Sequence, residues 1–474
     1  MVTHSLETDY LVVGTGAAGM AFTDALVSEA QRSGADLDVV MVDRRHAPGG
    51  HWNDAYPFVR LHQPSAYYGV NSLPLGDDTI DADGLNAGMY EQAGAAEICG
   101  YYDRVMRCSL LPSGAVRYFP MSEVLADGRV VSRLTGEAYE VHVRRAVVDA
   151  AYLEPSIPAT SAPPFAAASG VRCIPVGELA NLTEPAGRYV VIGSGKTAID
   201  ACLWLLQQGV DPGAIRWVKP REPWLRNRFH AQGGELVGDL IEGIALQVEA
   251  AASATSRGDL FDRLEAGGLL FRVDEQVVPT MYKAPTMSTA ELEVLRRIDD
   301  VVRLGHVRRI TRDRLELEEG SVPAGPGDLY VHCAAPGLNP APAVPIFAEG
   351  RITLQPMRTG LIPFNAALVG YIEATGRDIR EKNRLCPPNR LPDVPLDWLR
   401  GLLVELAADR AWSKEPDIAR WLEAARLNVS RGLRRRSDDP QVQAALTRFR
   451  AHAGPGVENL GRLLTDAASP RSLQ

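Results

Sequence analysis

Three glycines near the N-terminus have the spacing of a phosphate-binding turn. Gly14, Gly16 and Gly19 follow a short apolar run at residues 10–13 and precede an Ala-rich stretch that predicts a helix to about Ala30. In such a strand–turn–helix unit the first glycine permits the tight turn, the second lets the backbone approach a pyrophosphate, and the third lets helix and strand pack closely. The free N–H groups at the start of the helix then face the phosphates. The spacing therefore predicts a dinucleotide site.

An acidic residue stands where such a site needs one. Residues 37–42 form a second apolar run, and Asp43 follows it directly. A carboxylate at the end of this strand accepts hydrogen bonds from the ribose hydroxyls of an adenosine. The alternative is an ordinary turn followed by a surface acid, but the complete strand–turn–helix–strand context favours the dinucleotide site.

A second glycine motif follows the apolar strand predicted at residues 189–192. It reads Gly193-Ser194-Gly195-Lys196-Thr197-Ala198. The Gly-Lys-Thr portion is similar to a P-loop, but a P-loop needs a glycine at position 190, which is Val190. The motif therefore indicates a second strand–turn–helix dinucleotide site, with a helix expected to about Gln208.

The strand after this second motif ends in cations. Lys219 and Arg221 follow the apolar strand expected at residues 215–218. Cations at this position suit the 2′-phosphate of NADPH, whereas an NAD site usually has an acid there. The sequence thus favours NADPH over NADH, the alternative being that both side chains are solvated at the end of a strand.

Two dinucleotide motifs in this order resemble the flavin-dependent monooxygenases with two dinucleotide-binding domains, which include flavin-containing, N-hydroxylating and Baeyer–Villiger enzymes. The run from Pro48 to Trp52 contains Gly50 and is similar to the family's GGxW segment beside the flavin, and Arg60 continues that pattern. The likeness covers about residues 8–220 and, more weakly, 328–375. It implies FAD at the first motif, NADPH at the second, and O2 with a small organic molecule as the other reactants.

The same resemblance suggests which residues act in catalysis. His51 and His62 flank the expected flavin-facing loop, where an imidazole could donate to a flavin oxygen or shuttle a proton; each could instead bond only a loop carbonyl. Asn71 matches an Asn that the family carries near the flavin, with a turn cap as the alternative. Arg60 could pair with a phosphate, an anionic substrate or a surface carboxylate. A helix expected to start before Ala366 would direct its N–H groups at the flavin, or simply be capped.

The predicted fold is α/β, with two Rossmann-like dinucleotide-binding domains, the NADPH domain inserted in the FAD domain, and a helical C-terminal region. We expect a first FAD-binding segment at residues 1–160 and an NADPH-binding domain at 185–327 that contains a helical insertion at 224–297. A second FAD-binding segment is expected at 328–385 and the helical region at 391–474.

Composition narrows the remaining classes. The 474 residues include 50 Lys and Arg against 59 Asp and Glu, a net charge of −9, which disfavours nucleic acid and anionic membranes as partners. The six cysteines form no CxxC pair, so neither a dithiol centre nor a Cys-based metal site is expected. No apolar run reaches the roughly 18 residues that span a bilayer, and we expect a cytoplasmic protein. The sequence favours no particular oligomeric state.

These observations predict an FAD-dependent, NADPH-reduced monooxygenase that acts on a small organic molecule. Two alternatives stay open. One is an NAD(P)H-dependent flavin reductase or dehydrogenase that inserts no oxygen, and the other is a flavin-binding protein without turnover.

Overall fold

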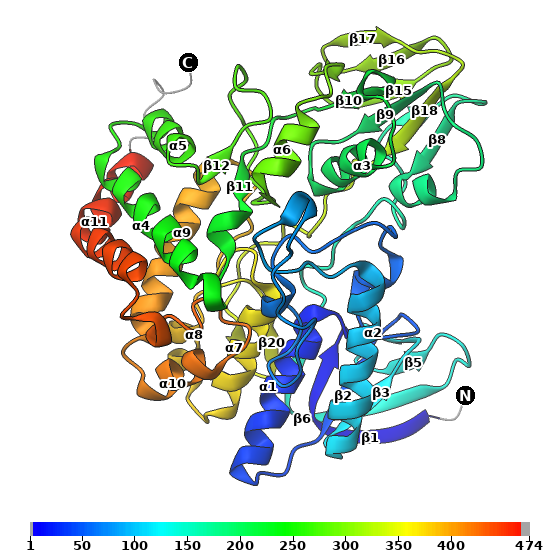
Figure 1. The fold of residues 1–474 in the computed structure, drawn as a ribbon. Coiled ribbons are helices and arrows are strands. Elements are labelled where there is room, and N and C mark those ends of the chain that lie inside the picture. Colours follow the sequence, from blue (N-terminus) through cyan, green and yellow to red (C-terminus); the bar gives the residue numbers. More distant parts are fainter. Residues whose placement is uncertain (1–2, 466–474) are drawn as a thin grey trace.

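The computed structural model describes residues 3–465 and divides into two sheet regions and a helical lobe. In Figure 1 the first sheet lies below, the second lies above it, and the helices of the lobe stand on the opposite side of the molecule. No helix within these described residues has both the length and the apolar character needed to cross a membrane.

The first sheet is built mainly from parallel strands. Its order is β19-β20-β6-β1-β2-β3, with the hairpin β4–β5 added along β6. All four residues of β2 are buried and apolar, as expected for a parallel strand covered on both faces. The strands are β1 (Thr3–Val13), β2 (Val39–Val42), β3 (Val116–Phe119), β4 (Ser122–Val124), β5 (Val130–Ser132), β6 (Ala138–Asp149), β19 (Phe347–Ala348) and β20 (Arg351–Thr353).

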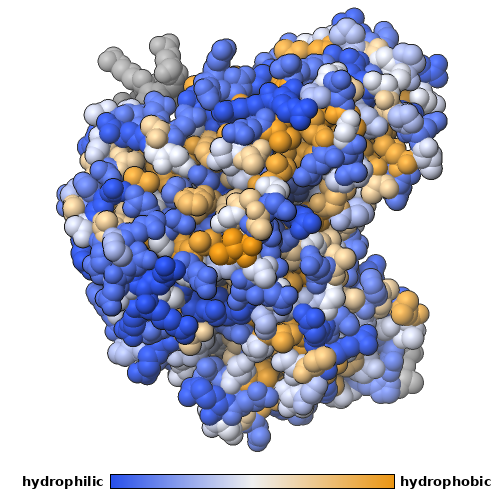
Figure 2. Space-filling view, viewed as in Figure 1, coloured by the Kyte–Doolittle hydropathy of each residue, from blue (hydrophilic) through white to orange (hydrophobic). Residues whose placement is uncertain are grey.

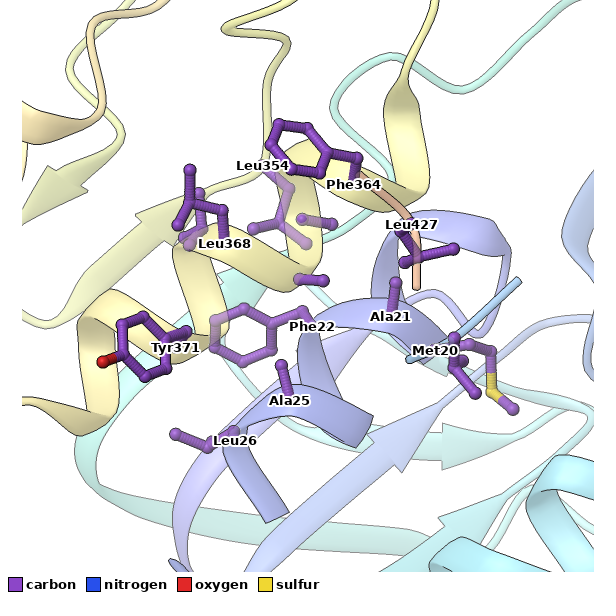
Figure 3. Packing of buried hydrophobic residues seen from close by; sticks show 14 of the residues in the cluster. Met20, Ala21, Phe22, Ala25, Leu26, Leu354, Phe364, Leu368, Tyr371 and Leu427 are labelled. Carbon is purple, nitrogen blue, oxygen red and sulfur yellow. The ribbon is translucent and has the colours of Figure 1, made fainter. Parts of the chain in front are cut away.

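Helices α1 (Ala17–Ser33) and α7 (Ile362–Ala374) pack against each other beside this sheet. A Cβ added at Gly370 of α7 would lie 2.5 Å from the carbonyl oxygen of Phe22 in α1, so only glycine allows this approach. Figure 3 shows Phe22 of α1 between Leu368 and Tyr371 of α7. Helix α2 (Ala95–Val105) contributes to the same core. The start of α7 confirms the helix predicted near Ala366.

The second sheet is parallel, in the order β14-β10-β9-β18-β8. The chain enters it after β6 and returns to the first sheet at β19 and β20, which confirms two Rossmann-like units with the second inserted in the first. Its elements are β8 (Arg172–Pro175), β9 (Arg188–Ile192), α3 (Lys196–Gln207), β10 (Ile215–Val218), α6 (Thr289–Leu295), β14 (Val301–Val302) and β18 (Asp328–His332).

Strand β18 corrects one predicted boundary. We expected residues from 328 onward to belong to the FAD-binding segment, but β18 lies between β9 and β8 in the second sheet. A fully buried apolar run indicates an interior parallel strand without indicating which sheet contains it. The return to the first sheet occurs about fifteen residues later, at β19.

A small antiparallel sheet lies beside the second one. It consists of β15 (Val307–Ile310), β16 (Arg314–Leu317) and β17 (Gly320–Pro323), with β7 (Ala166–Ala167) paired to β15. Strand β7 joins this sheet from the segment between the two sheet regions.

The helical lobe combines the insertion with the C-terminal region. In it, α4 and α11 lie side by side, and a Cβ at Gly456 of α11 would be 2.8 Å from the Val248 carbonyl oxygen of α4. The Asn459 side chain also donates to the carbonyl groups of Ala251 and Ala254, at 2.8 and 2.7 Å. The lobe contains β11 (Leu225–Asn227), α4 (Val237–Ser253), α5 (Arg257–Ala266), β12 (Leu270–Phe271), β13 (Thr286–Met287), α8 (Ile379–Leu385), α9 (Pro395–Trp412), α10 (Pro416–Ala424) and α11 (Pro440–Thr465).

Candidate active site

A cavity of about 680 Å³ lies where the two sheet regions and the helical lobe meet. Its lining comes from the first glycine motif and the loop after it, from the start of α3, and from α4, α9 and α11. Its volume is in the range of small-molecule and cofactor sites. Figure 2 shows that this side of the molecule is indented between the two sheet regions, and that apolar side chains gather along the middle of the face.

The first glycine turn has the geometry of a phosphate cradle. Gly14 has φ +103°, a conformation that favours glycine, and a Cβ at Gly19 would lie 2.0 Å from the Gly14 carbonyl oxygen. Gly16 caps α1 without a side-chain hydrogen bond, and the first turn contains no acid. The N–H groups at the start of α1 therefore remain available to an anion. Gly14 and Gly16 line the cavity.

Asp43 lies at the end of β2 and lines the same cavity. Its Oδ2 accepts from the Thr15 N–H at 2.7 Å and the Thr15 hydroxyl at 2.9 Å, and its Oδ1 accepts from the Arg45 N–H at 2.8 Å. A carboxylate has about four acceptor sites, so Oδ1 keeps capacity for a ribose hydroxyl. Asp43 thus fixes the glycine turn and remains placed for the predicted contact.

The loop after β2 closes onto the first glycine turn. Gly50 has φ +59°, and a Cβ there would lie 2.9 Å from the Gly16 Cα. The Trp52 indole N–H donates to the Tyr68 hydroxyl at 2.7 Å, which holds the loop against the core. The structure therefore brings Gly50 and Trp52 to the first motif, as predicted from the sequence.

His51 and His62 both line the cavity. Burial and the nearby Arg45 cation lower the pKa of His51 to about 4. Burial, with the cations of Lys196 and Arg228, likewise lowers the pKa of His62 well below its usual value. Both imidazoles are therefore neutral near pH 7 and suit hydrogen bonding better than donation of a full proton.

The second glycine motif is more open than the first. Gly195 caps α3 without a side-chain hydrogen bond, and a Cβ added there would meet nothing within 4 Å. Lys196 and Thr197 line the cavity, whereas Gly193 and Ser194 lie outside its lining. The Ser194 hydroxyl oxygen accepts weakly from the Arg221 N–H, at 3.4 Å.

A side-chain network connects the second motif to the loop after β2. Lys196 forms an ion pair with Asp200 one turn further along α3, and the Tyr56 hydroxyl donates to Asp200 at 2.7 Å. The ring of Phe58 stacks on Trp204 with centroids 4.6 Å apart. These contacts hold the two predicted dinucleotide sites at the same cavity.

The structure corrects the role predicted for Lys219. Its side chain is buried at 1% exposure, forms an ion pair with Glu222, and lies 4.4 Å from the Trp217 ring. An inward-facing ammonium with its own carboxylate is not open to a ribose phosphate. The sequence shows that a cation follows β10 but does not indicate that its side chain points into the protein.

Arg221 is partly exposed to solvent but already paired. Its guanidinium donates to both carboxylate oxygens of Asp393, at 2.7 and 2.9 Å. The ammonium of Lys283 lies 3.5 Å from the same carboxylate. Two cations and one anion therefore cluster beside the second motif, and the pairing with Arg221 lowers the pKa of Asp393.

Asn71 lies away from the cavity that it was expected to serve. Its side-chain oxygen accepts from the Leu427 N–H at 3.1 Å, and its own N–H donates to Asp24 of α1 at 3.1 Å. Leu427 packs beside Ala21 of α1 (Figure 3). Asn71 does not line the cavity, and its bond to the distant Leu427 N–H is not the local turn cap given as the alternative, so its role near the flavin stays a prediction.

Arg60 does line the cavity. Its guanidinium donates to the Gln92 carbonyl at 2.9 Å, and it forms no ion pair within residues 3–465. This contact matches none of the three roles predicted for it.

Several cavity residues carry no local sequence motif. Glu405 of α9 accepts from the Thr359 N–H at 2.9 Å, and burial raises the pKa of its carboxyl. Arg358 forms an ion pair with Asp409 at 2.6 Å, and Arg226 of β11 also faces the cavity. Glu405 and Asp409 come here through the packing of α9, which no spacing in the sequence could reveal, whereas Arg226 lies in the mixed aromatic and basic segment that follows the strand of the second motif.

Comparison with known proteins supports the fold. No model of a known protein family matches the chain. The uncharacterized proteins Rv2000 of Mycobacterium tuberculosis and Mb2023 of Mycobacterium bovis are 47% identical to it over 99% of this chain and 87% of theirs. The polycyclic ketone monooxygenase of Thermothelomyces thermophila is 13% identical, covering 95% of this chain and 89% of that one, with a TM-score of 0.52. A closed cyclohexanone monooxygenase covers 98% of both chains at 14% identity and a TM-score of 0.46. The chain therefore belongs to one family with the two mycobacterial proteins, and its fold is that of the flavin monooxygenases with two dinucleotide-binding domains.

Proposed function

We propose that the protein is a flavin-dependent oxidoreductase that uses NADPH and O2 to oxygenate a small organic molecule. The observation that carries this proposal is the single cavity lined by the starts of both glycine-motif helices, at Gly16 of α1 and Thr197 of α3. Such a cavity allows electrons to pass between two dinucleotides and a third molecule held in the same space.

The residues at the first motif fit FAD. The uncapped N-terminus of α1 and the positive φ of Gly14 suit a pyrophosphate, and Asp43 keeps acceptor capacity for a ribose hydroxyl. Bound there, FAD would supply the two-electron redox chemistry. The protein's contribution is to position this group and the substrate and to limit the access of water.

The second motif fits a nicotinamide dinucleotide, and the cluster beside it favours NADPH. Arg221 and Lys283 share one carboxylate, that of Asp393, which leaves the cluster with one net positive charge. A 2′-phosphate carries more charge than a carboxylate and competes with Asp393 for both cations. Lys219 has no part in this preference, because its side chain is buried against Glu222.

Other groups that line the cavity can stabilise negative charge or donate hydrogen bonds during a redox reaction. The first turn of α7, at Ile362 and Pro363, lines the cavity, and its N-terminus has no side-chain cap. The positive end of that helix stabilises negative charge nearby. His51 and His62 stay neutral near pH 7 and can donate hydrogen bonds without introducing charge.

The balanced equation of the proposed reaction defines the experiment that tests it. Substrate, O2, NADPH and a proton would give an oxygenated product, NADP⁺ and water, with one oxygen atom entering the product. Purified protein loaded with FAD is mixed with NADPH without oxygen, and loss of the flavin absorbance reports reduction. Cell extract is then incubated with protein and NADPH under ¹⁸O2 or ¹⁶O2, and products are compared by mass spectrometry. A product two mass units heavier under ¹⁸O2 supports the proposal.

One observation favours a second candidate, an NAD(P)H-dependent flavin reductase that inserts no oxygen. The Asn71 amide is bonded to Leu427 outside the cavity, so the residue that matches the family's Asn near the flavin does not line this site. Bleaching of the flavin by NADPH with no ¹⁸O in any product would support this candidate. Absence of bleaching would exclude both enzymes.

A further inference from the structure

The cavity extends from the glycine motifs into an apolar chamber within the helical lobe. Its walls are formed by Ile244, Val248 and Ala251 of α4, Leu402 of α9, and Val457 and Leu460 of α11. These six side chains are apolar and come from both the insertion and the C-terminal region, while Gln247 of α4 and Glu405 of α9 add polar groups to the lining. The chamber is therefore a feature that neither dinucleotide motif explains.

Six cations line the whole cavity, and five of them have a hydrogen-bonding or ion-pair partner. Arg60 donates to a carbonyl, while the other four pair with Asp or Glu carboxylates. Within the described residues, the Arg226 guanidinium has no hydrogen bond and no ion pair, although its side chain is half-buried. A partly buried cation without a protein partner gains from a ligand that supplies an anion.

Arg226 lies on the side of the cavity that faces α9. Its charge acts on Glu405 and Tyr282, but among residues 3–465 no carboxylate oxygen forms an ion pair with it. The Glu405 carboxyl instead accepts from the Thr359 N–H, and burial raises its pKa, which weakens its competition for Arg226. The guanidinium therefore lines the same cavity as the apolar side chains and has no anionic partner among the described residues.

We propose that this chamber binds an apolar molecule that carries a carboxylate, with the apolar part among α4, α9 and α11 and the carboxylate on Arg226. A guanidinium binds a carboxylate in a bidentate manner, and apolar walls favour a hydrocarbon body. The claim that this ligand is the substrate rests on the proposed function. The binding itself needs neither NADPH nor O2.

Calorimetric titration of the oxidised, FAD-loaded protein tests the binding separately from turnover. The probes are decanoate, 1-decanol and decylamine, which share one chain length and differ in the head group. We expect decanoate to bind at least tenfold more tightly than 1-decanol, and decylamine to bind most weakly. Equal binding of decanoate and decanol would overturn the inference, even if the ¹⁸O experiment succeeded.

Variants locate the two halves of the site. Arg226→Gln should weaken decanoate about ten- to a hundredfold and leave decanol unchanged, since a charge-assisted bond is lost. Arg226→Lys should lose less, because it keeps the charge. Arg263→Gln is the matched control, because Arg263 pairs with Asp259 on α5 outside the cavity. A loss of decanoate affinity in Arg263→Gln equal to that in Arg226→Gln would contradict a specific role.

Filling the chamber tests the apolar half. Ile244→Trp or Val457→Trp should weaken decanoate and decanol alike by about tenfold or more, because the indole occupies the space of the hydrocarbon chain. Flavin content and melting temperature identify any variant that fails to fold, and the second position then provides the measurement. The inference is overturned if folded Trp variants bind both probes as the wild type does. It is also overturned if NADP⁺ displaces decanoate competitively, since Arg226 would then belong to the dinucleotide site.

Discussion

The two glycine motifs have nearly the same sequence pattern but different surroundings. At the first, Gly50 of the following loop approaches Gly16 so closely that a Cβ would lie 2.9 Å from its Cα. At the second, a Cβ on Gly195 would meet nothing within 4 Å. A closed cradle suits a cofactor that stays bound, and an open one suits a coenzyme that binds and leaves. The glycine spacing indicates where a phosphate can bind, whereas the packing around the turn determines how long the dinucleotide stays bound.

The charged residues that end the strands after the two motifs, Asp43 and Lys219, also have different surroundings. Asp43 at the end of β2 turns back to bond Thr15 within its own glycine motif. Lys219 at the end of β10 turns inward to Glu222 and leaves the dinucleotide site. The first charged residue therefore belongs to the site it was predicted for, and the second stabilises the fold.

The largest expected effect comes from adding one methyl group to each motif. Gly19→Ala places a Cβ 2.0 Å from the Gly14 carbonyl oxygen, so α1 must shift away from β1. Overpacking of this kind costs about 3 kcal/mol or more. We expect Gly19→Ala to lose bound FAD and to melt at a lower temperature. Flavin absorbance per protein and thermal unfolding followed by circular dichroism measure both.

Gly195→Ala adds a methyl group at the second motif, at the position that corresponds to Gly16; the position that corresponds to Gly19 is already alanine there, Ala198. Its φ of −84° is accessible to alanine, and nothing lies near the new methyl group, so stability and flavin content should remain those of the wild type. The methyl group does occupy the approach of a pyrophosphate, and reduction by NADPH should need a higher coenzyme concentration. Equal loss of stability in both variants would remove the distinction between a closed and an open motif.

The next effect separates a structural cation from a coenzyme-binding one. Lys219→Met breaks a buried ion pair, which should lower the free energy of unfolding by about 3 kcal/mol. The loss is not larger because Arg303 still pairs with Glu222 at 2.7 Å. Arg221→Ala removes a partly exposed side chain and should instead lower the preference for NADPH over NADH about tenfold.

Denaturant titration and stopped-flow reduction with each coenzyme give the two readouts. If Lys219→Met changed the coenzyme preference without changing stability, the first prediction from the sequence would be restored. If Arg221→Ala left the preference unchanged, Arg221 would have no part in binding the 2′-phosphate, and its pairing with Asp393 would serve only the fold.

The sequence was sufficient for features that local spacing determines. The strands at β9 and β10, the glycine motifs, the approach of Gly50 and Trp52, and the start of α7 were all predicted from patterns within short windows. It was insufficient where the partner is distant along the chain. Arg221 pairs with Asp393 across 172 residues, and Asn71 bonds Leu427 across 356 residues. The chamber required packing of α4 against α11, which no periodicity in either helix specifies.

A smaller effect concerns the two cavity histidines and pH. The folded state lowers the pKa of His51 to about 4, whereas the unfolded chain has the ordinary value near 6.5. Folding therefore disfavours the charged form, and this contribution to stability is full above pH 6.5 and is lost as the pH falls toward 4. We expect wild type to lose about 2 kcal/mol through this group over that interval, less than the full shift implies because the ring borders the cavity.

His51→Gln should flatten this part of the stability profile, measured as melting temperature against pH in FAD-loaded protein. His62→Gln is the counterpart at the second motif and should have the same sign, because Lys196 and Arg228 also disfavour its charged form. A His51→Gln profile that still falls as steeply as wild type would mean that the imidazole is solvated.

The smallest expected effect concerns Asn71, where the prediction from the sequence and the structure disagree. If Asn71 only holds the Leu427 N–H, then Asn71→Ala removes one neutral hydrogen bond and should lower the free energy of unfolding by about 1 kcal/mol. Asn71→Asp keeps an acceptor but places a carboxylate beside the buried Asp24, so it should destabilise more.

Neither variant should change the fraction of NADPH electrons that appears as hydrogen peroxide, because Asn71 does not line the cavity. Peroxide yield per NADPH and melting temperature, measured on the same preparations, separate the two roles. More peroxide in Asn71→Ala at an unchanged melting temperature would return Asn71 to the active site and show that the loop moves when the cofactors bind.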